Sequence, residues 1–499
     1  MSGALAGCAV GPDYHLPTIS MPSMFLAQSG EKILQSTPSV SADLTQWWRA
    51  LHDTELDSLI ARALEANLDL EIALERLQAA RTLVTVIGDQ ALPVAGATAG
   101  GGVGSGSDET KGRVAQALRS AETASGLRSI NDAGGAAAAW ELDLFGKIKR
   151  EVEAQTADAE ALKDARDWVF VTVAADVAGA YLDMRARQRQ LVVLGENIAA
   201  ARGNLDLAQS RFDRGLTNEM DVSLAQRQLA TLQADVAPLA AQIDVSRHAI
   251  AVLLGHFPEE MAKELAKPGP IPALPGRVPV GLPVDLLRRR PDIREAERRL
   301  AAANAHIGSA IADLYPTVVL SGAAGAQGGI RSPSSLVPLT WIGSFGPSAT
   351  MPLLDFGALD AQIEIADLQT RGFLASYRQA ILTAVRQVDD AEASYRAQQQ
   401  RLASLDRALQ AARQATQLAT ERYDRGLSDF LNVLDAEREQ YELEERHVVT
   451  RQAEADDLVM LYKALGGGWP SNEVIPPIRP LQPALIAAAK HLLDSPQNP

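Results

Sequence analysis

The residue types that most often carry out catalysis are present in this chain, but their spacing matches no catalytic or metal-binding motif. Seven histidines are scattered through the 499 residues, without the short intervals that place two imidazoles on one metal ion. There is no HExxH motif, no GxxxxGK[ST] phosphate loop, and no grouping of acid, base and nucleophile. The sequence therefore predicts no enzyme activity, no cofactor and no metal site.

The only cysteine, Cys8, suggests a different chemistry. It cannot form an intramolecular disulfide, and a lone cysteine near a terminus is usually a tail residue without a role. Here it ends the sequence LAGC, the order in which bacterial lipoprotein signal peptides end before the lipidated cysteine. Only seven residues precede it, fewer than a signal peptide needs. Either the start codon is assigned too far downstream or the anchor is not used; we favour the first interpretation and predict lipidation at Cys8.

Composition limits the partners and the shape of the protein. The net charge of -15 and the pI near 5.0 argue against a nucleic-acid partner, because phosphate binding needs clustered Lys and Arg. Only 5% of the residues are aromatic although 46% are hydrophobic, so few large rings are available to fill a compact core. We therefore expect elongated helical packing.

Two segments of the chain are nearly the same, 211 residues apart: RFDRGLTNEMDVSLAQRQ from Arg211 and RYDRGLSDFLNVLDAERE from Arg422. In each, a glycine lies between long charged stretches, at Gly215 and Gly426. A residue without a Cβ readily takes positive φ, so each segment predicts a tight reversal of the chain. The simpler alternative, that Gly-Leu only marks a turn, does not explain why the flanking Arg and Asp are also duplicated.

The stretches that lead into these turns predict two long helices. Neither contains a proline between its Phe-Gly start, at Phe145 or Phe356, and its turn. About 70 helical residues at roughly 1.5 Å each would span on the order of 100 Å. Each stretch carries a heptad seam, which is typical of coiled coils. The first seam is Phe170, Val173, Val177, Ala180, Met184, Arg187, Leu191, Leu194, Ile198, Ala201, Leu205, Ala208 and Phe212, and the second has the residues 211 positions later, from Ile381 to Tyr423.

After each turn the heptads resume, so each half is predicted to be a long helical hairpin. The return helices span Thr217 to Leu254 and Ser428 to Leu465, and Pro238 is expected to kink the first of them.

Segments rich in Gly, Ala, Val, Ser and Thr precede both hairpins and predict strands. They run from Val94 to Gly106 and from Thr317 to Gly329, and each has a partner segment that ends at the Phe-Gly start of the following helix. The first pair is joined by a polar loop around residues 107–132. Four strands per chain cannot close a membrane barrel, since the smallest common barrels have about eight. Two copies would give eight strands, and three would give twelve and a wider lumen.

Several motifs in order resemble the outer membrane factor family, the TolC-like exit ducts, and within it the NodT-type lipoprotein branch. They are Cys8 with GPDY, LDLFGK, RRRPDIREAERRLAAANAHIGSAIADLYP, the two R(F/Y)DRGL turns and YKALGGGW. The resemblance covers the chain from Cys8 to about Pro470. It implies a mainly α protein with a β-barrel: a homotrimer with twelve strands in the outer membrane and a twelve-helix periplasmic tunnel.

The resemblance also implies function and partners. The protein would be the passive outer-membrane exit duct of a tripartite efflux pump in a Gram-negative bacterium, lipid-anchored at Cys8. A periplasmic adaptor would connect it to an inner-membrane transporter, and small molecules would leave through it. We expect residues 1–8 to be a residual signal peptide, 9–255 and 288–470 to be two repeats joined by a linker at 256–287, and 471–499 to be a tail.

The resemblance assigns roles to residues at the two turns. The adaptor would dock on Gly215, Leu216, Thr217, Gly426, Leu427 and Ser428. Asp221 would accept a hydrogen bond from the phenol of Tyr423 and hold the resting gate shut, while Ser428 stands where some members carry a reinforcing arginine. Asn432 and Asp435 fall where the family can place two aspartate rings, so one ring is replaced here by amides. Asp429 is the other nearby acid, and we favour a solvated helix face for it.

Two other functions explain part of the sequence. A protein-secretion duct of the same fold is an alternative, although the lipoprotein start and the LGGGW ending favour small-molecule efflux. A non-channel periplasmic coiled-coil scaffold or adaptor explains the heptads, but it does not explain the paired strand segments.

Overall fold

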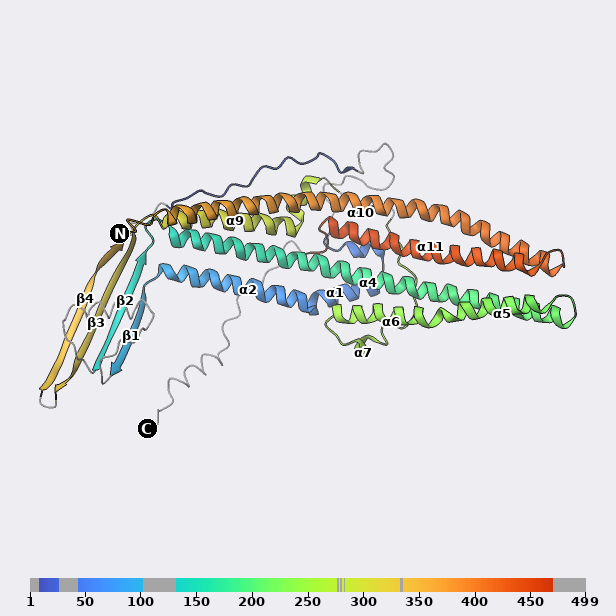
Figure 1. The fold of residues 1–499 in the computed structure, drawn as a ribbon, viewed down its shortest axis with the longest axis horizontal. Helices are drawn as coiled ribbons and strands as arrows, with labels where there is room; N and C mark the ends of the chain where they lie inside the picture. Colours follow the sequence, from blue (N-terminus) through green and yellow to red (C-terminus); the bar gives the residue numbers. More distant parts are fainter. Residues whose placement is uncertain are drawn as a thin grey trace.

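The computed structural model describes residues 9–26, 44–101, 132–275, 278, 281, 283–332 and 335–469. They form an elongated helical bundle with four strands at one end (Figure 1). At the other end lie the tips of two helical hairpins, where α4 turns into α5 and α10 turns into α11. The predicted lipidation site Cys8 and the tail after residue 470 lie outside the described residues.

The elements follow the predicted repeat. The first half contains η2 (Trp47–Leu51), α1 (Thr54–Ala66), α2 (Leu68–Gly88), η3 (Asp89–Ala91), β1 (Val94–Gly101), β2 (Asp132–Leu142), α4 (Lys147–Asp213), α5 (Glu219–Ala234) and α6 (Val236–Leu253). Then follow α7 (Pro258–Met261), η4 (Pro283–Asp285), α8 (Leu286–Arg289), α9 (Pro291–Ala312), β3 (Thr317–Ser332), β4 (Ser335–Thr350), α10 (Ala358–Asp424) and α11 (Phe430–Ala464).

The two long helices confirm the repeat. α4 and α10 have 67 residues each, and both begin and end 211 positions apart. Every position of the second predicted seam is buried or half-buried, and so is every position of the first except Phe212, whose side chain is 40% exposed. The heptad pattern thus identified the packed face of both helices.

Pro238 interrupts the first return helix, as predicted. The helix ends at Ala234 and restarts at Val236, so the return is divided into α5 and α6, while the corresponding α11 runs unbroken for 35 residues. Proline has no N–H, and its ring clashes with the carbonyl four residues earlier. That carbonyl belongs to Ala234, the last residue of α5.

The four strands form one antiparallel sheet in the order β1-β2-β3-β4. Ala139 of β2 pairs with Val94 of β1 on one side and with Ser321 of β3 on the other. The predicted strand segment that leads to Phe356-Gly357 stays extended only as far as Thr350. Beyond it, the carboxylate of Asp355 accepts hydrogen bonds from the backbone N–H groups of Gly357 and Leu359, at 3.4 and 2.9 Å. These residues therefore prepare the start of α10 instead of extending the sheet.

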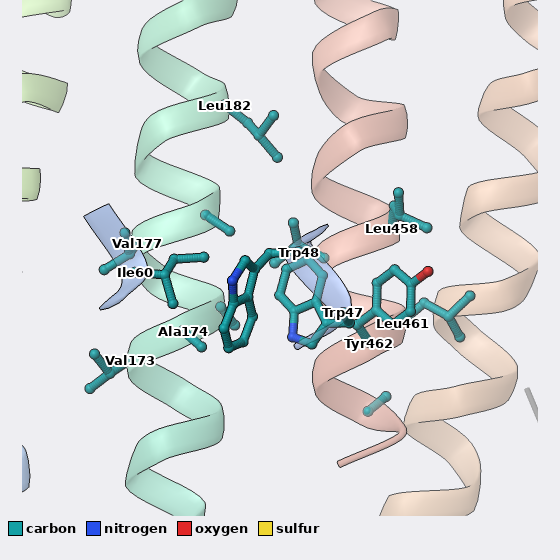
Figure 2. Close-up of a cluster of buried hydrophobic side chains, with 14 of the residues drawn as sticks. Trp47, Trp48, Ile60, Val173, Ala174, Val177, Leu182, Leu458, Leu461 and Tyr462 are labelled. Carbon is teal, nitrogen blue, oxygen red and sulfur yellow. The ribbon is translucent and has the colours of Figure 1, made fainter. Parts of the chain in front are cut away.

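The main hydrophobic core lies at mid-length, where η2 is inserted between the long helices. Trp47 stacks on Tyr462 of α11 with ring centroids 4.8 Å apart, and Trp48 meets Trp47 edge-on at 5.9 Å (Figure 2). Small residues such as Ala174 lie where α4 comes closest to these rings. Two tryptophans and one tyrosine thus bring large rings to this part of the core in a chain that has few of them.

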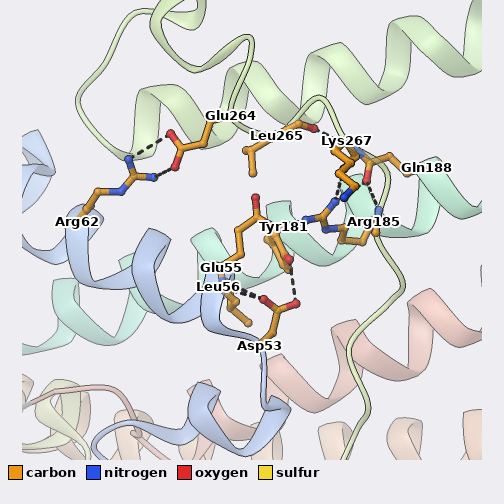
Figure 3. A network of polar contacts seen from close by, with 11 residues as sticks. Asp53, Glu55, Leu56, Arg62, Tyr181, Arg185, Gln188, Glu264, Leu265 and Lys267 are labelled. Carbon is orange, nitrogen blue, oxygen red and sulfur yellow. Dashed lines mark hydrogen bonds and ion pairs between the residues drawn. The ribbon is translucent and has the colours of Figure 1, made fainter.

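A polar network attaches α1 and the segment after α7 to α4 (Figure 3). Asp53 accepts from the backbone N–H groups of Glu55 and Leu56, at 3.0 and 3.1 Å, and from the hydroxyl of Tyr181 at 2.9 Å. Arg185 pairs with Glu55 and donates to the carbonyl of Lys267 at 2.9 Å. The predicted linker is therefore held against the first hairpin by directed contacts.

Residues 9–26 run as an extended strap along the outside of the bundle, starting beside the strands (Figure 1). The backbone N–H of Val10 donates to the carbonyl of Phe145 at 3.1 Å. Arg150 of α4 donates to the carbonyl of Val10 at 3.0 Å and to Asp13 at 2.8 Å. At the far end the backbone N–H of Leu26 donates to Asp389 at 2.8 Å. The strap is thus fixed at both ends.

No helix among the described residues combines the length and the apolar character needed to cross a bilayer.

Carboxylates at the contact of α4 and α11 make stability depend on pH. Burial, followed by the charges of Asp183 and Asp457, raises the pKa of Asp456 to about 7 against the opposing charge of Arg187. A carboxyl whose pKa is raised on folding stabilises the fold while protonated, and this contribution is lost as pH rises from about 4 through about 7. We expect Asp456→Asn to flatten the fall of the thermal unfolding midpoint between pH 5 and 8.

The matched control is Asp206→Asn, an exposed carboxylate of α4. It should keep the pH dependence of the unmodified protein. If Asp456→Asn kept it too, Asp456 would not be the group that titrates.

Candidate functional site at the hairpin tips

Both tips are built by the same helix-ending hydrogen bonds. Gly215 and Gly426 have φ of 71° and 72°, the left-handed conformation that glycine adopts without strain. The N–H of Gly215 donates to the carbonyl of Phe212 at 2.8 Å, and that of Leu216 donates to the carbonyl of Arg211 at 2.9 Å. The same two bonds recur at Gly426 and Leu427, both at 2.8 Å. This is the Schellman motif, which satisfies the last carbonyls of a helix.

The motif presents two leucines at the end of the molecule. Leu216 and Leu427 are 62% and 64% exposed, while Thr217 and Ser428 beside them are half-buried. A leucine in this position usually packs back on its own helix. Here both point outward, so each tip offers an apolar group surrounded by polar backbone.

Just behind the first tip, Asp221 accepts a hydrogen bond from the hydroxyl of Thr217. Asn218 caps α5 by accepting from the backbone N–H of Asp221 at 3.2 Å. The predicted bond from the phenol of Tyr423 to Asp221 is not made among the described residues, where Asp221 accepts from Thr217 instead. Tyr423 does lie close to this pair, since its pKa is raised chiefly by burial and next by the charge of Asp221.

Tyr423 is nearly fully buried, at 3% exposure, yet its hydroxyl has no hydrogen-bond partner among the described residues. Its ring lies 5.1 Å from that of Phe430 in a small cluster with Val222 and Val433. This cluster joins the two hairpins directly behind their tips. The hydroxyl of Thr217 lies close to this phenol and opposes the rise in the pKa of Tyr423.

Arg211 is the residue that sequence reasoning missed. Its guanidinium donates to the carbonyl of Tyr423 at 2.9 Å and to that of Asp424 at 3.3 Å, and it lies 4.5 Å from the centre of the Tyr423 ring. It therefore neutralises the carbonyl end of α10 from the other hairpin. The sequence did show that Arg211 and Arg422 are duplicated, but it did not show what the first of them touches.

The predicted pore-lining residues lie on an exposed face of α11. Asn432 and Asp435 are both exposed, and Asp435 pairs with Arg438 at 3.5 Å. A cation that approached Asp435 would therefore compete with an arginine of the same helix. The hydroxyl of Ser428 is buried and has no partner among the described residues, and the position matching Asp221 is Asn432.

Within the described part of the chain, no group of three or more His, Cys, Asp or Glu is arranged to hold a metal ion.

Comparisons with known proteins agree with this architecture. The family model for the outer membrane efflux protein matches residues 59–256 and 282–467. Nodulation protein T of Rhizobium leguminosarum bv. viciae is 31% identical over 503 residues, which cover 99% of this chain and 97% of that protein. The solvent efflux pump outer membrane protein SrpC of Pseudomonas putida is 31% identical over 471 residues, covering 93% and 96%.

Among solved structures, the outer-membrane channel OprN matches with a TM-score of 0.79 and 34% identity, over 93% of this chain and all of that one. The predicted TolC-like fold is confirmed by this match. The relatives are channels and not enzymes, which confirms the predicted lack of enzyme activity and makes the coiled-coil scaffold alternative wrong. The chain belongs to the outer membrane efflux protein family.

Proposed function

We propose that three copies of this chain form the outer-membrane exit duct of a tripartite efflux system. In this proposal a periplasmic adaptor links the duct to an inner-membrane transporter, and small molecules leave passively through the lumen. Support comes from the names of the relatives, which include solvent, toluene and cation efflux proteins. These names also favour small molecules over secreted proteins as the cargo.

The observation that supports the trimer is that the helices on two opposite flanks of the chain, α2 and α10, are each left uncovered on one side. α4 packs between α2 and α9, whereas the matching helix α10 packs on α9 and lies on the opposite flank from α2 (Figure 1). Large apolar side chains of both uncovered helices face outward: Leu68, Ile72, Leu83 and Val86 on α2, and Ile365, Leu368, Phe373 and Leu382 on α10. Apolar rows of this size usually mark a protein interface.

The sheet gives the same indication. β1 and β4 are its two edges, and among the described residues each pairs with another strand on one side only. Pairing β4 of one copy with β1 of the next would close the sheet, and three copies would give the predicted twelve strands. The long helices leave the strands directly, so a helical tunnel would continue from the closed sheet.

In this assembly six tips would form a ring at the inner end, where the adaptor would dock on Leu216 and Leu427. The gate would lie just behind, at Asp221, Tyr423, Asn432 and Asp435. The unpartnered phenol of Tyr423 and the exposed acid Asp435 support this placement.

We expect the double variant Asp221→Ala with Tyr423→Phe to loosen the resting gate. The change removes the charge beside Tyr423 and any bond its phenol makes on assembly, so single-channel conductance in planar bilayers should rise several-fold. Unchanged conductance would show that these two groups do not hold the gate. The control is Asp206→Asn, which removes an exposed charge of α4.

The strap supports an outer-membrane anchor at Cys8. Val10 is bonded to Phe145 where β2 leads into α4, so the described part of the strap begins level with the base of the sheet. An acyl chain on Cys8 would then enter the leaflet next to the strands.

The test is to express the gene, fractionate the membranes and measure the native mass of the extracted protein. A trimer in the outer membrane, with restored solvent or drug tolerance in a strain lacking its own duct, is the expected result. A monomer in the soluble fraction would overturn the proposal.

A further inference from the structure

The contact that joins the two hairpin tips is made by only one of two equivalent arginines. Arg211 of α4 lies on the carbonyl end of α10, bonded to Tyr423 and Asp424. Its counterpart 211 positions later is Arg422, near the end of α10. Arg422 is exposed, and its guanidinium has no hydrogen-bond or ion-pair partner among the described residues.

The surface that Arg422 would need also exists, and it too is unused. The residue that matches Tyr423 is Phe212, at the carbonyl end of α4. Tyr423 is 3% exposed beneath Arg211, whereas Phe212 is 40% exposed and is the one seam position that is not covered. The end of α4 therefore resembles the end of α10 with its arginine removed.

A third matching pair shows the same difference. Leu207 packs against the cluster of Tyr423 and Phe430 between the two tips. Its counterpart Leu418, one turn before Arg422 on α10, is 52% exposed. Arg211, Tyr423 and Leu207 thus make contacts between the two tips within the chain. Their counterparts Arg422, Phe212 and Leu418 are all exposed.

Within the described part of the chain this relation can be satisfied only once, because α4 and α10 are its two matching long helices and there is no third. We propose that Arg422 of one copy lies on the carbonyl end of α4 of the next copy, donating to the carbonyl of Phe212 and covering its ring. This rests on the trimer proposed above. The second partner of the contact is the carbonyl of Asp213, the counterpart of Asp424. Cation–π contact and the helix dipole both favour the arrangement.

The contact between two tips of one chain and the contact between tips of neighbouring copies then differ in chemistry. Within a chain the arginine meets a phenol beside Asp221 and Thr217, on the apolar ring of Phe430. Between copies it meets a phenyl ring, with Asn432 and Ser428 in place of the acid and threonine. Glu219 takes the position of Phe430 there and adds a carboxylate near the arginine. The contact between copies has fewer apolar side chains around the arginine, so the ring of tips separates there first.

Cross-linking tests the contact directly. Arg422→Cys with Phe212→Cys, in a Cys8→Ser background, is treated with a short bis-maleimide in outer-membrane vesicles. We expect covalent dimers and trimers on a denaturing gel. The matched control is Arg211→Cys with Tyr423→Cys, which should link within the chain and leave its mass at one copy.

Hydrogen exchange on the native trimer gives a second measurement, which does not depend on whether the cross-link forms. Arg422→Gln should deprotect amides at the end of α4, around residues 209–216, and Arg422→Lys should deprotect them less. Arg211→Gln should act instead at the end of α10, around residues 420–427.

The two proposals fail in different ways. A native trimer with neither the between-copy cross-link nor the change at the end of α4 overturns the role of Arg422 and leaves the duct intact. A native monomer overturns the trimer, and with it both proposals.

Discussion

Replacing both Leu216 and Leu427 with aspartate is expected to abolish export while leaving the assembled protein in the membrane. Each leucine is more than half exposed, so the change should alter folding stability by no more than about 0.5 kcal/mol. At a docked adaptor the same side chains would be buried, each contributing about 1.5–3 kcal/mol. A buried, unpaired carboxylate costs far more. Six such charges per ring should therefore prevent docking.

The measurement is solvent and drug tolerance in a strain that depends on this duct, together with the native mass of the extracted protein. Leu216→Met with Leu427→Met keeps the apolar surface and should retain tolerance. If the aspartate variant lost the trimer as well as export, the tips would be structural. If it exported normally, the adaptor would dock elsewhere.

Arg290→Ala is expected to be the most destabilising single change in the described part of the chain. Arg290 is the largest fully buried side chain, and it donates to the carbonyl of Ala464 at 2.7 Å and to Asp292 at 2.6 Å. It also reaches Gln387 at 2.9 Å and lies over the ring of Trp168. It thus joins the start of α9 to α4, α10 and α11. Removing one partner of a buried ion pair typically costs about 3–5 kcal/mol.

The loss should appear as a lower thermal unfolding midpoint of the detergent-extracted protein and a lower yield in the membrane. Arg288→Ala, two residues earlier and exposed, is the matched control and should change the midpoint little. Equal midpoints for the two variants would mean that Arg290 is replaceable by packing alone.

The long helices and their turns could be predicted from the sequence because their determinants are local. A seam of apolar residues at spacings of three and four, without an internal proline, specifies a long helix whatever else the chain does. The turns at Gly215 and Gly426 follow from one residue type at one position, and the break at Pro238 follows from a missing N–H. The seam and the glycine turn each occur in both halves of the chain, which strengthens their prediction.

The contacts between the hairpins could not be predicted, because they join residues far apart in the chain. Arg211 and Tyr423 are separated by 212 residues, and nothing in the local pattern shows that their helix ends meet. For the same reason, the choice of Thr217 over Tyr423 as the partner of Asp221 was not foreseen. The strap from Val10 to Leu26 has no periodicity at all, so its course follows only from the partners it finds.

The identical lengths of α4 and α10 limit how this protein can change in size. Because both helices have 67 residues, the two tips end at the same depth. Seven residues inserted into one hairpin, outgoing and returning, would displace its tip by about 10 Å relative to the other. A partner that grips both tips could then reach only one of them. Any lengthening of this molecule must therefore occur in four helical segments together, twice in each half.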